Sequence, residues 1–191
     1  MVTYHQFHEN VSKRFSLKAV ENLAGLNMDY RSYSGVLVII HFSDKIPEVI
    51  LTRRSRYLNN HAGEISFPGG RFSHADTSLL DTALRETFEE IGLVVNKESV
   101  VGSLEPTYTY TSGILIYPYL AIMDAIEKDL RPNCEVDRII SISVDKLMNS
   151  ITEDQEHSLK NYRMFKIIID DYVIWGATAR ILKNLFDKMV P

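Results

Sequence analysis

The clearest pattern of apolar and polar positions lies in the middle of the chain. Apolar or small side chains recur every three to four residues over 77–91, which predicts an amphipathic helix. Asp76, Thr77 and Ser78 are all suitable residues to cap its start. Gly92 suits the left-handed position that commonly follows a helix, so we expect the helix to end there.

The same spacing predicts a helix over 7–24, packed on the domain, and a terminal helix over 176–189. The β-branched apolar run at 35–40 is typical of a central strand that is buried on both faces. A short turn separates it from a second strand-like run at 48–53. We therefore expect these two strands to form a hairpin.

The remaining segments read as short strands, a short helix and loops. Strands are predicted at 64–67, 100–104, 116–123, 137–144, 165–169 and 172–175, and a short helix at 145–149. The polar stretch 151–161 is predicted to be a mobile loop. The aromatic and polar stretch 107–113 has two interpretations, as a wall of the substrate pocket or as a hairpin connection, and both stay open.

Composition limits the class of protein. The chain has 191 residues, of which 45% are hydrophobic and 24% charged, values that are ordinary for one globular domain. A net charge of −4 argues against a surface that coats nucleic acid, which is normally basic. A small phosphorylated ligand needs only a few local cations and remains compatible with this charge.

The cellular compartment is constrained by three features. Cys134 is the single cysteine, so an intramolecular disulfide is excluded and a reducing compartment is favoured. The longest apolar run, 114–123, is interrupted by Pro118 and is shorter than the roughly 20 residues of a membrane-spanning helix. The first residues show no cationic segment followed by an apolar one. We therefore expect a cytoplasmic protein.

Three carboxylates on the predicted helix are the main candidates for chemistry. Glu86, Glu89 and Glu90 stand at i, i+3 and i+4, so they share one face, where like charges repel. Arg85 can offset one of them through its i,i+4 partner Glu89. A hard divalent cation such as Mg²⁺, which prefers oxygen ligands, would neutralise the rest. The alternative is a solvated, glutamate-rich helix face.

The surrounding residues favour the first interpretation. The stretch 85–93 reads Arg-Glu-Thr-Phe-Glu-Glu-Ile-Gly-Leu and resembles the second half of the Nudix box, Arg-Glu-apolar-x-Glu-Glu-x-Gly-apolar. Thr87 stands where an aliphatic residue is usual. The family pattern has Gly, five residues, Glu, seven residues and Arg. Here Gly70 is followed by five residues, Asp76 and eight residues before Arg85, so Asp replaces Glu and one residue is inserted.

Two further stretches resemble the coenzyme A pyrophosphatase branch of the Nudix hydrolases. One runs over 51–70 and contains Leu-Thr-Arg-Arg-Ser and Gly-Glu-Ile-Ser-Phe-Pro-Gly-Gly, and the other is Trp-Gly-Ala-Thr-Ala-Arg-Ile-Leu at 175–182. The resemblance covers most of 30–185 and implies an α/β/α sandwich with a mixed sheet. It divides the chain into an N-terminal helical extension, 1–28, and a Nudix hydrolase domain, 29–191.

The resemblance implies a reaction, a cofactor and a set of site residues. The reaction is hydrolysis of the diphosphate of coenzyme A, or of its acyl derivatives, to adenosine 3′,5′-bisphosphate and 4′-phosphopantetheine, with Mg²⁺ or Mn²⁺. The expected metal ligands are Glu86, Glu89, Glu90 and the Gly70 carbonyl. Arg85 is expected to hold Glu89, and the expected substrate contacts are Arg53, Arg54, Ser66 and Gly69. The general base stays open among Glu86, Glu105 and Glu135, with Glu135 the better downstream candidate.

Alternatives accompany each of these expectations. The substrate could instead be a nucleoside triphosphate, ADP-ribose or a dinucleotide, and a non-catalytic nucleotide sensor is a different class of protein. The basic cluster of Arg53, Arg54 and Arg56 is either a solvated strand end or a phosphate-binding site. Arginine binds phosphate well through two parallel hydrogen bonds. A lone loop histidine, His61, is more typical of a structural role than of a ligand. A homodimer is compatible with the sequence.

Overall fold

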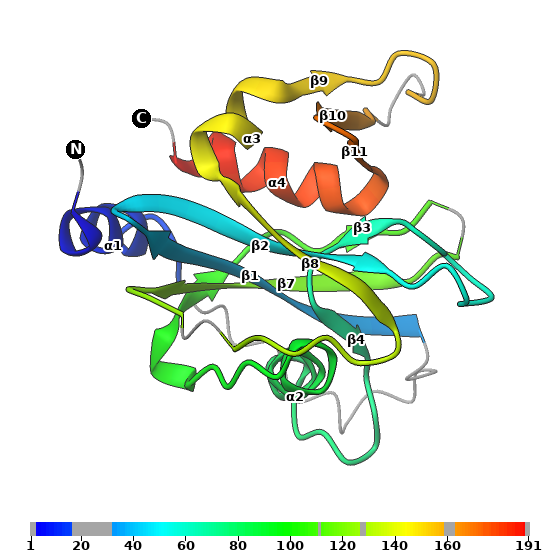
Figure 1. Cartoon of the computed structure of the whole chain (residues 1–191), viewed down its shortest axis with the longest axis horizontal. Helices are drawn as coiled ribbons and strands as arrows, with labels where there is room; N and C mark the ends of the chain where they lie inside the picture. Colours follow the sequence, from blue (N-terminus) through cyan, green and yellow to red (C-terminus); the bar gives the residue numbers. More distant parts are fainter. Residues whose placement is uncertain (1–2, 17–31, 111, 127–128, 159–162, 190–191) are drawn as a thin grey trace.

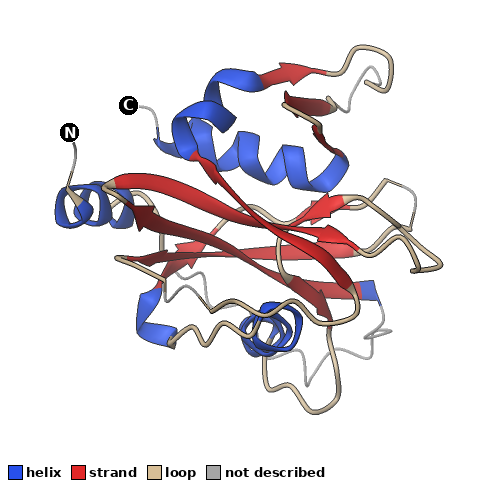
Figure 2. Cartoon of the chain, in the orientation of Figure 1, coloured by secondary structure: helices blue, strands red, loops and turns tan. Residues whose placement is uncertain are grey.

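The computed structural model describes residues 3–16, 32–110, 112–126, 129–158 and 163–189. A mixed β-sheet forms the middle layer, with helix α2 (Leu79–Ile91) on one face and helix α4 (Gly176–Met189) on the other (Figure 1). The strands of this layer cross between the two helical layers in Figure 2. The fold is therefore the α/β/α sandwich that the resemblance to the Nudix hydrolases implies.

The main sheet runs in the order β3-β2-β1-β7-β5, with β4 on β1, β6 on β7 and β8 on β2. Its strands are β1 (Tyr33–Ser43), β2 (Ile46–Arg54), β3 (Ile65–Ser66), β4 (Gly69–Arg71), β5 (Val100–Ser103), β6 (Thr107–Tyr108), β7 (Leu115–Met123) and β8 (Val136–Ser143). β1 and β7 are parallel and the other pairs are antiparallel, so the sheet is mixed. The short 3₁₀ helix η3 (Lys97–Ser99) precedes β5.

β1 is the central strand that its apolar run predicts. Val36, Val38 and Ile40 pack into the core beneath α4, while Leu37 and Ile39 pack into the core above α2. Successive strand side chains point to opposite faces, so a run with no polar interruption is needed where both faces are covered. The predicted hairpin with β2 is also confirmed, with Asp44 and Lys45 at the turn in left-handed conformations.

The chain segment after β8 forms the layer around α4. Helix α3 (Val144–Ser150) leads into a three-stranded sheet of β9 (Ile151–Glu153), β10 (Phe165–Ile169) and β11 (Tyr172–Trp175) (Figure 1). The predicted mobile loop over 151–161 is therefore wrong at its start. Polarity misled the prediction because β9 pairs with β10 through backbone hydrogen bonds while its side chains stay partly exposed. Residues 159–162 lie outside the described part of the chain.

The first helix, α1 (Tyr4–Ser12), starts and ends earlier than the predicted 7–24. Thr3 and Gln6 form a reciprocal capping box that fixes its start. After Ser12 the chain leaves the helix and the Ser16 carbonyl accepts a hydrogen bond from the Ser103 N–H of β5, so 13–16 are not helical. Residues 17–24 fall outside the described residues, and the division of the chain near residue 28 stays a prediction.

The segment 107–113 contains a hairpin connection. Thr107 and Tyr108 form β6 and pair with Ile116 and Leu115 of β7. A role of this segment in lining a pocket stays a prediction. Within the described residues, none of the helices has the length and apolar character needed to cross a membrane.

A close approach between β1 and α2 fixes how α2 sits on the sheet. Gly35 lies against the backbone of Leu79 and Ala83, and a Cβ at this position would lie 3.2 Å from the Ala83 nitrogen and closer still to Leu79. Gly35→Ala should therefore destabilise the fold by about 1 to 3 kcal/mol, because α2 must shift to admit the methyl group. Urea denaturation measures this loss.

The matched control is Ser43→Ala at the exposed end of the same strand, which should change the unfolding free energy by less than about 0.5 kcal/mol. Equal stability of Gly35→Ala and the wild type would mean that the contact between β1 and α2 is loose.

Candidate active site

The site lies where β4 meets α2. β4 pairs with β1, which places Gly70 opposite Gly35 and next to the side chain of Glu86. A Cβ at Gly70 would stand only 2.6 and 2.7 Å from the two Glu86 carboxyl oxygens. Only glycine leaves this space free, so the Gly-Gly turn brings a backbone segment directly onto a helix carboxylate.

Glu90 is the most deeply buried of the three helix carboxylates, with 5% of its surface exposed. Its Oε2 accepts a hydrogen bond from the Gly69 N–H at 3.2 Å. Burial raises the pKa of Glu90 to about 7, and the nearby Glu86 and Glu135 act in the same direction, while the Gly69 N–H and Arg54 partly oppose this rise. A buried carboxylate with so little compensation favours a further positive charge beside it.

Arg85 organises the rest of the cluster. It donates two hydrogen bonds to Asp76, at 2.7 and 2.9 Å, and one each to Glu86 at 2.9 Å and Glu89 at 3.1 Å. The predicted pair between Arg85 and Glu89 is confirmed. Burial alone would raise the pKa of Asp76, but the hydrogen bonds from Arg85, Ser73 and Thr82 outweigh it and lower that pKa.

The sequence did not reveal what Asp76 does. The residue that stands in place of the family glutamate is a second, buried partner of Arg85, reached across nine positions by the loop before α2. Ser78, the last of the three candidate caps, starts the helix by accepting a hydrogen bond from the Asp81 N–H. Gly92 ends it in the left-handed conformation as predicted.

Glu86 and Glu89 differ in their surroundings. Burial raises the pKa of Glu86, whereas Arg85 opposes that rise and Glu89 and Asp76 add to it. Glu89 is far more exposed, with 51% of its side chain accessible to solvent. Glu86 therefore interacts electrostatically with both other helix carboxylates. Arg85 holds Glu86 and Glu89 through hydrogen bonds.

Arg53 and Arg54, at the end of β2, have different partners. Arg54 lies near Glu90 and helps to keep its carboxyl ionised. The Arg54 Nε is buried and makes no hydrogen bond to any residue that the structure describes. Arg53 instead pairs with Asp137 on β8, with nitrogen–oxygen distances of 2.5 and 2.6 Å. Of the two, Arg54 is the one beside the helix carboxylates.

Glu135 and Glu105, the two downstream candidates for a general base, lie in different surroundings. Glu135 is near enough to Glu90 to raise its pKa, and the Glu135 carbonyl accepts a hydrogen bond from the Ser55 N–H at 2.7 Å. Glu105 accepts a hydrogen bond from Lys188 at 3.3 Å and its N–H donates to Asn184, both on α4. Glu135 is thus placed toward the carboxylate cluster and Glu105 toward the terminal helix.

Ser34, Ser66 and His61 also lie near the site and make hydrogen bonds or ion pairs. The hydroxyl of Ser34 donates to the Gly70 carbonyl at 2.7 Å, a contact that the sequence pattern gave no signal for. Ser66 lies against Thr52, whose hydroxyl donates to the Ser66 carbonyl at 3.3 Å. His61 pairs with Glu64 at 3.0 Å, which agrees with a structural role.

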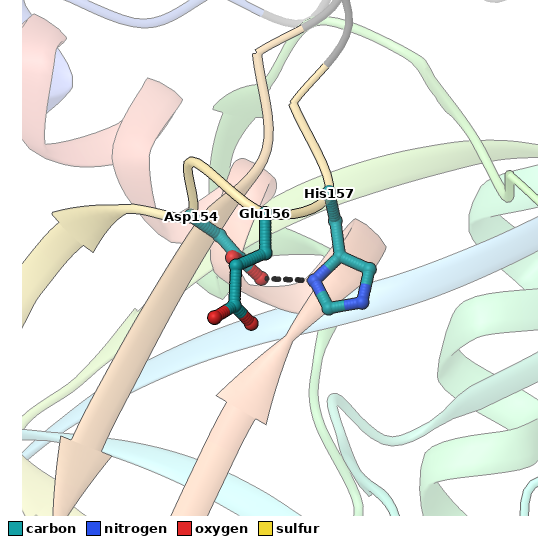
Figure 3. Close-up of side chains that lie close together, drawn as sticks. All are labelled: Asp154, Glu156 and His157. Atoms are coloured by element: carbon teal, nitrogen blue, oxygen red, sulfur yellow. Dashed lines mark hydrogen bonds and ion pairs between the residues drawn. The ribbon is translucent and has the colours of Figure 1, made fainter.

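A second group of potential ligands lies away from α2, at the end of β9 (Figure 3). Among the described residues, it is Asp154, Glu156 and His157, and not the α2 carboxylates, that bring three ligand atoms within 4.8 Å of one another. Asp154 is 7% exposed, bonds to His157 at 2.8 Å and pairs with Lys166 at 3.7 Å. Lys166 can balance its charge and the His157 ring binds it directly, which is the pattern of a structural ion-pair cluster.

The donor set around α2 nevertheless fits a divalent cation. It consists of carboxylate oxygens and a backbone carbonyl, the hard ligands that Mg²⁺ and Mn²⁺ prefer. The space that a Cβ at Gly70 would fill keeps this carbonyl segment within reach of Glu86. Glu86, Glu89, Glu90 and Gly70 are therefore the residues that could hold such an ion.

Comparisons with known proteins identify the family of the chain. The NUDIX domain family matches residues 31–164. A mitochondrial coenzyme A diphosphatase of Mus musculus, NUDT8, is 33% identical over 165 residues, which cover 83% of this chain and 78% of that protein. The Nudix hydrolase NudL of Pectobacterium atrosepticum is 30% identical over 176 residues, which cover 90% of this chain and 89% of that protein.

Solved structures agree on the fold. A MutT/nudix family protein from Enterococcus faecalis has a TM-score of 0.61 at 17% identity, and the match covers 86% of this chain but 64% of that longer one. The MutT protein of Methanosarcina mazei has a TM-score of 0.56 at 17% identity and covers 87% of this chain and 100% of its own. The family match spans well over half of the sequence. The chain therefore belongs to the Nudix family, as a pyrophosphohydrolase similar to the coenzyme A diphosphatases.

Proposed function

We propose that the protein hydrolyses the diphosphate of coenzyme A, or of its acyl derivatives, in a reaction that depends on Mg²⁺ or Mn²⁺. The products are adenosine 3′,5′-bisphosphate and 4′-phosphopantetheine. The observation that carries this proposal is the carboxylate cluster on α2 in a chain whose relatives include named coenzyme A diphosphatases. A cytoplasmic location and a homodimer belong to the same proposal.

Arg54 supports a phosphate-bearing substrate. Its guanidinium lies beside Glu90, and its buried Nε lacks a hydrogen-bond partner among the described residues. A buried donor without a partner costs free energy, and a phosphate oxygen is a strong acceptor for arginine. We assign Arg54 to the diphosphate, because this arginine faces the carboxylates rather than the opposite side of the sheet.

Each helix carboxylate has its own role in this proposal. Glu86, Glu89 and Glu90, with the Gly70 carbonyl, would hold the cation. When bound, that cation supplies neutralising charge for the diphosphate and lowers the pKa of a water molecule. Arg85 positions Glu86 and Glu89, and the Gly69 N–H positions Glu90. Ser34 orients the Gly70 carbonyl.

The proton of the attacking water needs an acceptor. Glu135 fits better than Glu105, because Glu135 affects the Glu90 carboxyl while Glu105 is engaged by Lys188 and Asn184. Glu86 remains the third candidate for this role. An acceptor must come within hydrogen-bond reach of the water in the complex with substrate.

A hydrolysis panel tests the proposed function. Coenzyme A, acetyl-coenzyme A, 3′-dephospho-coenzyme A, ADP-ribose, a dinucleotide and a nucleoside triphosphate are each incubated with Mg²⁺ or Mn²⁺, and the products are identified by mass. The proposal expects the highest kcat/KM on coenzyme A or its acyl derivative. A clear preference for a nucleotide that lacks the pantetheine arm would replace the substrate while leaving the Nudix chemistry in place.

Glu89→Gln and Glu90→Gln should each lower kcat by at least about 100-fold, because an amide cannot replace the carboxylate charge at a cation. Circular dichroism should show an intact fold. Glu98→Gln, at an exposed glutamate of η3, is the matched control and should keep full activity. Retained turnover in either helix variant at saturating metal would remove that residue from the site.

Arg54→Ala should lower kcat/KM by about 1.5 to 3 kcal/mol in transition-state stabilisation, the range of a charged hydrogen bond. The loss should be equal on coenzyme A and on 3′-dephospho-coenzyme A, because the contact is to the diphosphate. Arg163→Ala, at an exposed arginine just before β10, is the control and should keep full activity. A loss confined to coenzyme A would instead place Arg54 at the 3′-phosphate.

The pKa of Glu90 predicts how stability changes with pH when divalent metal is removed by a chelator. The folded carboxyl titrates at about 7 and the unfolded one near 4.5, so the folded state binds more protons between these values. Stability should therefore fall as pH rises from 4.5 to 7, with a contribution from Glu90 of at most about 3 kcal/mol. Glu90→Gln should remove this part of the slope, as measured by denaturation at each pH. Identical slopes in the two proteins would contradict the assignment.

A further inference from the structure

A hollow of about 360 Å³ lies on the other side of the sheet end from Arg54. Its floor and walls come from the end of β2, from the loop into β3 and from β11, which lies beside β3. The residues that matter for its chemistry are Arg53, Arg56, Glu64, Asp171, Val173 and Trp175. Its volume falls in the range of small-molecule sites.

The charges of the hollow cancel. Two arginines, Arg53 and Arg56, and two carboxylates, Glu64 and Asp171, line it. Arg53 is already paired with Asp137, outside the lining, at 2.5 Å. A nucleotide that carries an additional phosphate would meet as many negative as positive groups here, so the hollow favours a neutral ligand.

An aromatic and aliphatic surface borders the hollow. Trp175 is 45% exposed and Val173 is 52% exposed, although both are large apolar side chains on a paired strand. An indole offers a broad apolar face and one N–H donor, which suits a ligand that combines alkyl groups with amides. The Arg138 guanidinium donates to the Tyr172 hydroxyl at 3.3 Å and closes the side toward β8.

The hollow is within reach of the carboxylate cluster. Residues 63–65 line it and continue along the chain to Gly70, which is five residues beyond Ile65. Five residues span at most about 17 Å even when fully extended. Arg53 and Arg54 face opposite sides of β2, so a long ligand bound at Arg54 could continue past β3 into the hollow.

A larger hollow of about 570 Å³ fits such a ligand less well. It is lined by Ile46 and Glu48 at the start of β2 and by Lys146 of α3. Ile46 and Arg54 are the two ends of a nine-residue strand, so this hollow lies at the far end of β2 from the carboxylates.

We propose that the hollow beside Trp175 binds the pantetheine arm of the substrate, the neutral part that contains two amides and a thiol or thioester. The inference rests on the proposed function and deepens it, because it assigns one half of coenzyme A to one side of the sheet. The adenosine 3′,5′-bisphosphate half then lies on the Arg54 side, away from the balanced charges of the hollow.

Trp175 makes a direct binding test practical, because it is the single tryptophan of the chain. Its emission is followed while 4′-phosphopantetheine or adenosine 3′,5′-bisphosphate is added to the wild-type protein with Mg²⁺. We expect a saturable change with 4′-phosphopantetheine and none with adenosine 3′,5′-bisphosphate. The reverse result, or no response to either compound, overturns the assignment of the arm.

Kinetics of Trp175→Ala provide the second test. KM should rise about ten-fold on both coenzyme A and 3′-dephospho-coenzyme A, which share the arm, while kcat stays within about two-fold. Trp175→Phe should recover part of the loss. Ile168→Ala, which removes an exposed apolar side chain of the same small sheet outside the hollow, is the matched control and should leave KM unchanged.

The outcomes separate the two proposals. If Trp175→Ala raised KM on coenzyme A alone, the 3′-phosphate and not the arm would lie in the hollow. If KM were unchanged on both substrates, no part of the substrate would bind in the hollow. Either result overturns the inference. A wild-type protein that hydrolyses coenzyme A but fails both tests contradicts only the site of the arm. A wild-type protein that does not hydrolyse coenzyme A contradicts the proposed function itself.

Discussion

The site depends on keeping several carboxylates close together at the edge of a protein core. Glu90 is buried, Glu86 is partly buried, and the charge of Glu86 raises the cost of ionising Glu90. Arg85 meets much of this cost by binding Asp76, Glu86 and Glu89 at once. The negative charge that Arg85 and Arg54 leave uncompensated would favour a divalent cation at this position.

The sheet supplies the geometry that side chains alone could not. Gly35 lets β1 approach the backbone of α2, and the pairing of β1 with β4 then sets Gly70 against Glu86. On β2, the two neighbouring arginines point to opposite faces of the sheet: Arg54 lies toward the carboxylates and Arg53 toward β11. A ligand held at both places would have to cross the end of the sheet, as a long molecule such as coenzyme A can.

Much of the fold and of the candidate site was predictable from the sequence, and the features that were not predicted have physical causes. The apolar run of β1 and the caps of α2 are local signals, and the pair between Arg85 and Glu89 follows from helix spacing. The contact between Asp76 and Arg85 depends on how a loop folds back, which spacing does not encode. Alternation places Arg53 and Arg54 on opposite faces, but only the packing of α2 shows which face holds the carboxylates. β9 is specified by its partner β10 rather than by its own polar residues.

The central claim is that the α2 carboxylates, and not the tighter group at Asp154, bind the cation. Binding of Mn²⁺, followed by its electron paramagnetic resonance signal, tests this claim directly in the wild type, in the double variant Glu89→Gln/Glu90→Gln and in Asp154→Asn. The account predicts saturable binding in the wild type and in Asp154→Asn, and its loss in the double variant. Loss of binding in Asp154→Asn with retention in the double variant would contradict it.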